Sequence, residues 1–131
     1  MGKLRRNDLL YPGLSYQIIG CAFEAHNQVG GGHKEVVYQR AMAQSLRDIN
    51  LKFEEQVYFP IKFKDKIVGK GFIDFLIDGK IVVEIKKGDK FSKKHIDQVL
   101  DYLKSRELKL AVLINFGSNT VSFRRVVNFD S

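Results

Sequence analysis

Two carboxylates and one lysine interrupt the two otherwise apolar strands expected within residues 71–86, on either side of the turn at Asp78-Gly79. Asp74 stands alone, whereas Glu84 and Lys86 are two residues apart. Charged groups within a buried sheet are costly unless they are paired or bind a metal ion. Two carboxylates and the backbone carbonyl of Ile85 would offer the oxygen ligands that Mg²⁺ or Mn²⁺ prefers. Such an ion can neutralise a scissile phosphate and acidify a bound water, so the stretch indicates phosphodiester hydrolysis.

Lys86 would then orient the attacking water or stabilise the charge that builds up at phosphorus. The alternative is purely structural, a buried ion pair of Lys86 with Asp74 or Glu84 and no metal. The spacing alone leaves both interpretations open, because one Asp followed by Glu-x-Lys is a loose pattern.

The metal interpretation requires the three side chains to lie on one face of a sheet. Alternation along a strand places Glu84 and Lys86 on the same face. Whether Asp74 joins them depends on the hairpin at residues 78–79. A two-residue loop would place Asp74 opposite Val83, on the other face.

A three-residue loop of residues 77–79 solves this problem. It pairs Leu76 with Lys80 and Asp74 with Val82, so that all three charged side chains share one face. We predict this register because it also gathers the apolar side chains on the opposite face. These are Ile73, Phe75, Val83 and Ile85.

Hydrophobic periodicity predicts the elements that position these residues. We expect helices at residues 14–28 and about 33–49, strands at 57–64, 71–77 and 81–85, a helix after Ser92, and strands at 108–116 and 120–127. Ser92 is the expected N-cap of its helix, and Pro60 indicates an edge strand. The strand–helix–strand unit around that helix predicts one parallel pair. The expected fold is one α/β domain over residues 1–131, with a mixed central sheet flanked by helices and a loosely ordered segment at residues 1–13.

The chain of 131 residues has a formal net charge of +7, which favours polyanionic partners. A basic surface without a partner is the alternative on charge alone. The candidate phosphate contacts lie in two basic segments, Lys87, Lys90, Lys93 and Lys94 in one and Arg124 and Arg125 in the other. Cys21 is the only cysteine, which indicates a reducing compartment, and we expect the cytoplasm. No apolar run approaches the length of a membrane span, so no membrane partner is expected.

Three further polar residues could belong to the site. Glu35 opens the second helix, either as a carboxylate aimed at the metal or as a first-turn acid favoured by the helix dipole. Gln98 and Tyr102 lie four residues apart and share a helix face, whose ordinary interpretation is a partly exposed flank. His26 and His33 lack the spacing of zinc ligands.

The segment from Gly32 to Tyr38, Gly-His-Lys-Glu-Val-Val-Tyr, matches the pattern that names the GxxExxY family. This family is a branch of the PD-(D/E)XK nuclease-like superfamily, and the resemblance covers about residues 14–127. Supporting marks are Ile19-Gly20 leading to His26, Gln98, and the segment Leu113-Ile114-Asn115-Phe116-Gly117. The resemblance implies a restriction-endonuclease-like αβββαβ core, the order that periodicity also predicts.

The resemblance also implies roles for the matching residues. Asp74 and Glu84 would be ligands of Mg²⁺ or Mn²⁺, and Lys86 would be the catalytic lysine. Glu35 resembles the helical acid of the superfamily, a further metal ligand or water anchor. One departure is that many relatives carry an Arg just before the metal-binding Asp, where this chain has Phe72-Ile73.

Gln98 and Tyr102 resemble the Gln-x-x-x-Tyr motif of exonucleases related to bacterial recombination nucleases. There the Gln helps to place the DNA strand near the metal, which makes Gln98 a candidate catalytic residue and Tyr102 a candidate DNA contact. The expected function is a metal-dependent nuclease acting on DNA, with RNA as a second substrate to test and a homodimer as the expected assembly. The alternatives are a catalytically inactive module that binds nucleic acid or protein, and a small structural protein with a buried ion pair.

Overall fold

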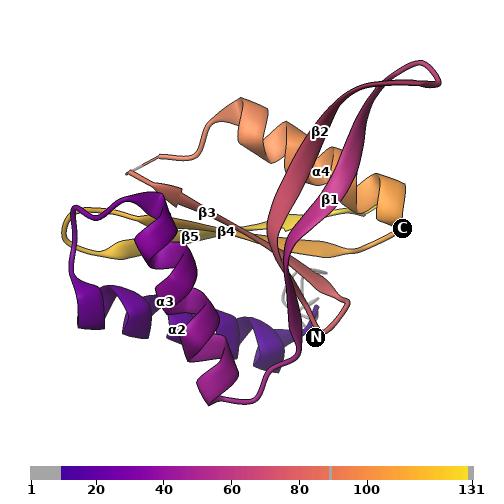
Figure 1. Ribbon diagram of the computed structural model, residues 1–131. Helices are drawn as coiled ribbons and strands as arrows, with labels where there is room; N and C mark the ends of the chain where they lie inside the picture. The colour runs from indigo at the N-terminus through magenta and orange to yellow at the C-terminus, as the bar shows by residue number, and fades with distance from the viewer. Residues whose placement is uncertain (1–9, 89, 130–131) are drawn as a thin grey trace, which may run out of the picture.

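The computed structural model describes residues 10–88 and 90–129 (Figure 1). In chain order the elements are α2 (Pro12–Val29), α3 (Glu35–Asp48), β1 (Phe53–Phe63), β2 (Lys66–Ile77), β3 (Ile81–Lys87), α4 (Lys93–Arg106), β4 (Leu110–Phe116) and β5 (Val121–Val127). Two helices, three strands, a helix and two strands is the predicted order. The Ser92 side chain accepts a hydrogen bond from the backbone N of His95 at 3.1 Å, as expected of an N-cap.

The five strands form one mixed sheet in the order β1-β2-β3-β4-β5. The neighbours β3 and β4 are parallel because α4 crosses between them, and the other neighbours are antiparallel. Pro60 lies in β1 at the edge of the sheet, where its missing N–H costs no ladder bond. The predicted restriction-endonuclease-like α/β fold is therefore confirmed.

Helices cover both faces of the sheet, with α2 and α3 on one side and α4 on the other (Figure 1). All seven residues of β4 are buried, because this central strand is covered on both faces. The hairpin of β1 and β2 is long, and its far end extends away from the helices (Figure 1). No helix in residues 10–88 and 90–129 is both long and apolar enough to cross a membrane.

The N-terminal segment differs in part from the prediction of a loosely ordered stretch at residues 1–13. Residues 1–9 lie outside the described residues, so that part of the prediction is not addressed. Leu10 and Tyr11, however, pack against the core, and α2 already begins at Pro12. Proline is well suited to the first turn of a helix, where its missing N–H would have no partner.

The loop between β2 and β3 has three residues, as predicted, but they are residues 78–80 rather than 77–79. Ile77 pairs with Ile81, and Leu76 pairs with Val82. The predicted pairs Leu76–Lys80 and Asp74–Val82 are therefore wrong by two positions. The observed register keeps both Ile77 and Ile81 fully buried and leaves Lys80 exposed in the loop.

The alternation of β2 is interrupted at Asp74, which sequence periodicity did not predict. Ile73 packs in the apolar cluster beneath α4, whereas Phe75 packs in the cluster beneath α2 and α3. The prediction that both side chains fill one face is therefore wrong. The neighbouring strand β1 deviates at the same level, where Gln56 has a left-handed backbone with φ of 49°.

Candidate active site

The site forms where β2 and β3 separate, next to the break at Asp74. The backbone N of Asp74 donates to Oε1 of Glu84 at 2.8 Å, and the backbone N of Ile85 donates to Oδ2 of Asp74 at 2.8 Å. Ladder pairing of the two strands is present at Phe75–Val83 and toward the loop. The two carboxylates therefore take over the hydrogen bonding between the strands at this level and are fixed side by side.

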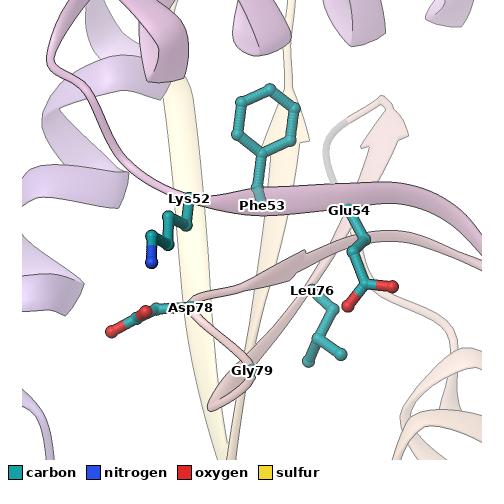
Figure 2. A pocket seen from close by; sticks show the side chains of 6 residues that line it. All are labelled: Lys52, Phe53, Glu54, Leu76, Asp78 and Gly79. Atoms are coloured by element: carbon teal, nitrogen blue, oxygen red, sulfur yellow. The ribbon is translucent and has the colours of Figure 1, made fainter.

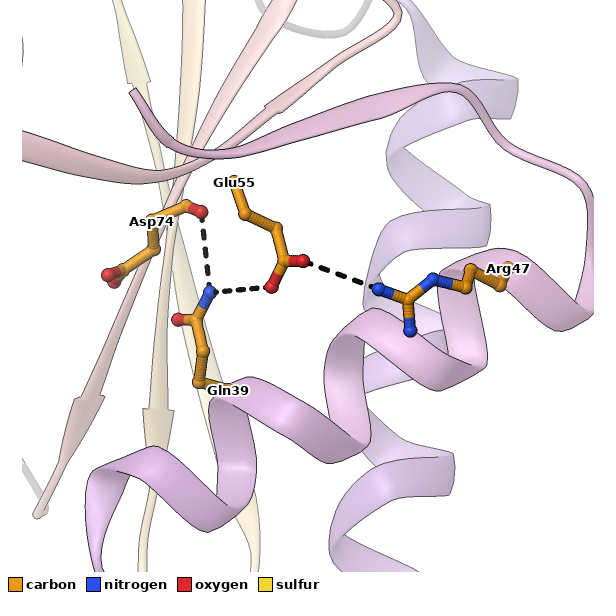
Figure 3. A network of polar contacts seen from close by, with 4 residues as sticks. All are labelled: Gln39, Arg47, Glu55 and Asp74. Atoms are coloured by element: carbon orange, nitrogen blue, oxygen red, sulfur yellow. Dashed lines mark hydrogen bonds and ion pairs between the residues drawn. The ribbon is translucent and has the colours of Figure 1, made fainter. Parts of the chain in front are cut away.

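Two glutamines hold Asp74 from β1 and from α3. The side-chain amide of Gln56 donates to Oδ1 of Asp74 at 3.1 Å. The amide of Gln39 donates to the backbone carbonyl of Asp74 at 3.4 Å and to Oε1 of Glu55 at 3.3 Å, and Arg47 pairs with the same Glu55 at 3.4 Å (Figure 3). In this view the carboxylate of Asp74 points away from Gln39. The network fixes the backbone of Asp74 while its carboxylate remains on the Glu84 side.

Burial and like charge raise the pKa of both carboxyl groups. Desolvation, followed by the neighbouring Asp74, raises the pKa of Glu84 from 4.5 to about 8. Desolvation also raises the pKa of Asp74, and the hydrogen bonds from Ile85 and Gln56 oppose this shift. Two buried carboxylates this close cannot both ionise cheaply without a neighbouring cation.

Lys86 contributes positive charge to the site without forming a contact ion pair. It lowers the pKa of both carboxyl groups electrostatically, but no ion pair within 4.0 Å in the described part of the chain joins it to Asp74 or Glu84. The structural alternative, a buried Asp/Glu–Lys ion pair, is therefore not what holds these strands together.

A cleft of about 210 Å³ opens beside this pair, between the β1–β2 hairpin and α4. It brings together Glu84, Lys86 and Gln98, three residues that the sequence singled out. The remaining lining residues are Phe59, Ile61, Lys70, Gly71, Phe72, Ile73, His95 and Val99. Lys70 supplies a cation on the strand where many relatives carry Arg just before the Asp.

Sequence reasoning missed His95, which lines the cleft one turn before Gln98. Its spacing of three residues from Gln98 was a usable signal, because such residues share a helix face. Desolvation, followed by the positive charge of Lys86, lowers the pKa of His95 below 6.5, with a smaller effect of Lys94 in the same direction. The imidazole is therefore neutral near pH 7 and can accept a proton. Lys70 and Gln56 were also missed, and alternation along a strand gave no signal for either.

The segment from Gly32 to Tyr38 places Glu35 next to the C-terminal end of β3. Gly32 has φ of 82°, a left-handed conformation that favours glycine. The Tyr38 hydroxyl donates to the carbonyl of Gly30 at 2.8 Å, and its ring stacks on Phe116 with centroids 4.4 Å apart. The backbone N of Lys87 donates to Oε2 of Glu35 at 3.4 Å. Tyr38 thus anchors the start of α3, and Glu35 lies where its charge raises the pKa of Asp74 and Glu84.

The donor set fits a hard divalent cation at the Asp74–Glu84 pair. Both carboxylates are oxygen ligands in a desolvated position, and the N–H of Ile85 points toward Asp74, so its carbonyl is directed to the same side of β3. Among the described residues no three Asp, Glu, His or Cys side chains converge on one ion position. Glu35 is therefore not placed as a third ligand, although it remains within electrostatic reach.

The predicted nucleic-acid contacts are not gathered at this cleft. Lys87, Lys90, Lys93 and Lys94 are exposed but are not among the residues that line the cleft, and Lys93 pairs with Asp97 at 2.8 Å. Arg124 and Arg125 lie on β5, which β4 separates from β3. Arg125 donates to the carbonyl of Leu10 at 2.7 Å and faces the α2 side, so it serves the fold there.

Tyr102 does not reach the surface as a predicted DNA contact would. It is 2% exposed and packs edge-on against Phe59, with ring centroids 5.3 Å apart. The reason is that α4 turns its Val99–Leu103 stripe into the sheet, and Tyr102 belongs to that stripe whereas Gln98 lies outside it.

A separate pocket of about 220 Å³ lies at the other end of β2. Figure 2 shows Lys52 and Asp78 on one side of it and Glu54 and Leu76 on the other. It contains none of the predicted site residues. The candidate site is therefore the cleft beside α4.

Comparison with known proteins bears on the family and the fold of the chain. A family model described as the PD-(D/E)XK nuclease superfamily matches residues 12–126. Among solved structures, the crystal structure of SSO0001 superposes with a TM-score of 0.54 at 19% sequence identity, covering 90% of this chain and 60% of that one. At that identity the likeness shows the fold alone, and the chain spans only 60% of that protein's length. No curated protein matches this sequence significantly.

Proposed function

Because this chain belongs to the PD-(D/E)XK nuclease superfamily, we propose that it is a nuclease that hydrolyses DNA phosphodiester bonds with Mg²⁺ or Mn²⁺. The observation that carries the proposal is the carboxylate pair of Asp74 and Glu84. The pair is desolvated, is fixed by reciprocal hydrogen bonds, and lacks a contact ion pair with Lys86 in the described part of the chain. Burial and like charge make it costly for both carboxyl groups to ionise, and a divalent cation bound between them would offset that cost.

Asp74, Glu84 and the carbonyl of Ile85 would hold the ion, and Glu35 lies within electrostatic reach of both carboxylates. The ion would supply Lewis acidity at the scissile phosphate and lower the pKa of water. Lys86 faces the same cleft, where its ammonium can stabilise the charge that builds up at phosphorus. Gln98 can donate hydrogen bonds that orient the strand, and His95 is neutral and can take the proton of the attacking water. Water adds to phosphorus and gives one proton to His95, the bond from phosphorus to one sugar oxygen breaks, and that oxygen takes a proton from solvent water as it leaves.

Several finer assignments belong to this proposal. We assign the chain to the GxxExxY branch, supported by the way Gly32, Glu35 and Tyr38 act together at the start of α3. DNA is the proposed substrate because Lys70 and Lys86 line the cleft and the chain has a net charge of +7, and RNA is the second substrate to test. The single buried cysteine, Cys21, supports the cytoplasm as the compartment. The small size supports a homodimer, which light scattering would detect.

The second candidate is a module that keeps the fold and binds nucleic acid without cutting it. It is favoured by the apolar Phe72-Ile73 at the position where many relatives have Arg. This module would bind DNA in a salt-sensitive way, and its binding would survive Asp74→Ala. Lys70 weakens this candidate, because it adds a second cation to the cleft that Glu84 and Lys86 line.

The test is cleavage of labelled single-stranded, duplex and branched DNA, and of RNA, with Mn²⁺ or Mg²⁺. Wild type is compared with Glu84→Gln and with Glu54→Gln, a matched change at an exposed acid outside the cleft. We expect cleavage that requires the metal, is lost in Glu84→Gln and persists in Glu54→Gln. A wild-type protein that cuts none of these substrates but binds DNA at low salt would favour the binding module instead.

A further inference from the structure

A second and larger cavity, of about 420 Å³, lies on the other side of Phe59 from the cleft. Phe59 lines both spaces, so they are two parts of one groove between β1 and α4. The other lining residues are Pro60, Lys62, Asp101, Tyr102, Ser105 and Arg106. Its volume is within the range of small-molecule and nucleotide sites.

The helix α4 sets the spacing between the two parts. It presents His95 and Gln98 to the cleft and Ser105 and Arg106 to the second cavity. Eight residues separate Gln98 from Arg106, which is about 12 Å along a helix axis. A group held at Arg106 is therefore well removed from a phosphate held beside Glu84.

The walls of the second cavity combine aromatic rings with cationic groups. The Phe59 ring lies over Gly71, and a Cβ at position 71 would force this ring to shift. The Arg106 guanidinium lies 5.2 Å from the centre of the Tyr102 ring and donates to the carbonyl of Tyr58 at 3.3 Å. These contacts hold Arg106 in place, and the exposed Lys62 stands across from it on β1.

Three polar groups complete the lining of the cavity. The hydroxyl of Tyr102 is buried and has no hydrogen-bond partner among the described residues. The hydroxyl of Ser105 donates to the carbonyl of Tyr102 at 3.0 Å, and Asp101 is the single acid of the lining. Rings beside fixed cations are the composition by which proteins hold single-stranded nucleic acid.

We propose that this cavity is a second nucleotide subsite, in which Lys62 and Arg106 bind the phosphate backbone of a single strand whose scissile phosphate lies at the cleft. The proposal rests on the proposed nuclease function and adds that the substrate enters as a single strand along α4. Phe59, standing between the two parts, offers a ring on which a base stacks. A strand too short to span both parts gains nothing from the second cavity.

The experiment measures binding of fluorescent oligothymidylates by anisotropy in EDTA over a series of salt concentrations. The probes are a dinucleotide and a strand of about ten nucleotides. The variants are Arg106→Gln and Lys62→Gln on the two walls, and Arg40→Gln on the exposed side of α3 is the matched control. Cleavage with Mn²⁺ is followed on the longer strand in parallel.

We expect Arg106→Gln and Lys62→Gln each to weaken binding of the longer strand about tenfold at low salt. Each should also reduce the slope of log affinity against log salt by about 0.7, the value for one lost phosphate contact on a single strand. Dinucleotide binding and Arg40→Gln should match wild type. A wild type that cuts while both wall variants bind like Arg40→Gln overturns the subsite and leaves the nuclease function intact. A wild type that binds through Arg106 but cuts nothing keeps the subsite and overturns the nuclease function.

Discussion

The backbone N of Asp74 donates a 2.8 Å hydrogen bond to the carboxylate of Glu84. The carboxylate of Asp74 in turn accepts from the residue after Glu84, at the same distance. Each carboxylate is thus held by a backbone N–H of the neighbouring strand. This reciprocity fixes the pair before any ion or substrate binds, which is the preorganisation that an electrostatic site requires.

Stability of the metal-free protein should fall as pH rises from about 4.5 to about 8. The pKa of Glu84 is raised to about 8 in the folded protein and is 4.5 in a free side chain, so the folded state holds a proton that the unfolded state has lost. Asp74 shifts in the same direction. Urea denaturation in EDTA at several pH values measures the free energy of unfolding. Glu84→Gln should flatten the decline, and a wild type whose stability rises over this range would contradict the prediction.

Mn²⁺ should stabilise the folded protein through the same pair. An ion that binds only the folded state raises the melting temperature with its concentration, by mass action. We expect this rise in wild type, and we expect it to be absent in Asp74→Asn and Glu84→Gln. Glu54→Gln should respond as wild type does. If Asp74→Asn gains as much as wild type, the ion binds elsewhere. Because this readout needs no cleavage, it tests the metal site separately from the activity.

His95→Gln should lower the cleavage rate about a hundredfold, the lower end of the range for a lost general base. The imidazole lines the cleft and is neutral near pH 7, so it can take a proton from the attacking water. The remaining rate should no longer fall at acid pH, because the group whose protonation causes that fall is gone. Binding of the oligonucleotide should persist. An unchanged pH profile with a lower rate would mean that His95 only positions the strand.

Asn115→Leu should lower the cleavage rate without lowering the stability of the protein. Asn115 lies on β4, the strand next to Lys86. Asn115 is directly paired with Lys86, is 1% exposed, and neither amide atom has a partner among the described residues. If the amide only fills space, removing two unpaired polar atoms leaves stability equal or higher and activity unchanged. We expect the higher or equal stability together with at least a tenfold loss of cleavage, because a buried amide next to Lys86 can position its ammonium through a bound water. Urea denaturation measures the stability of the variant, and kcat for cleavage measures its activity.

The order of elements and the edge position of β1 could be predicted from the sequence, because both follow from local patterns. Periods of 3.6 and 2 identify helices and strands, and Pro60 excludes a central strand. The parallel pairing of β3 with β4 follows from the single helix between them. The same local logic brought Asp74 beside Glu84, which the structure shows, although the strand pairs it predicted were wrong by two positions.

The sequence could not decide features that depend on contacts between distant segments. Ile73 and Phe75 lie on opposite faces because Gln56, on another strand, takes a left-handed backbone opposite Asp74. Tyr102 is buried because the hairpin brings Phe59 onto its ring, although it shares a helix face with Gln98. His95 and Lys70 join the site for the same reason, since the cleft exists only where the hairpin meets α4. Periodicity tells which side of an element is apolar, and only packing decides which other element covers it.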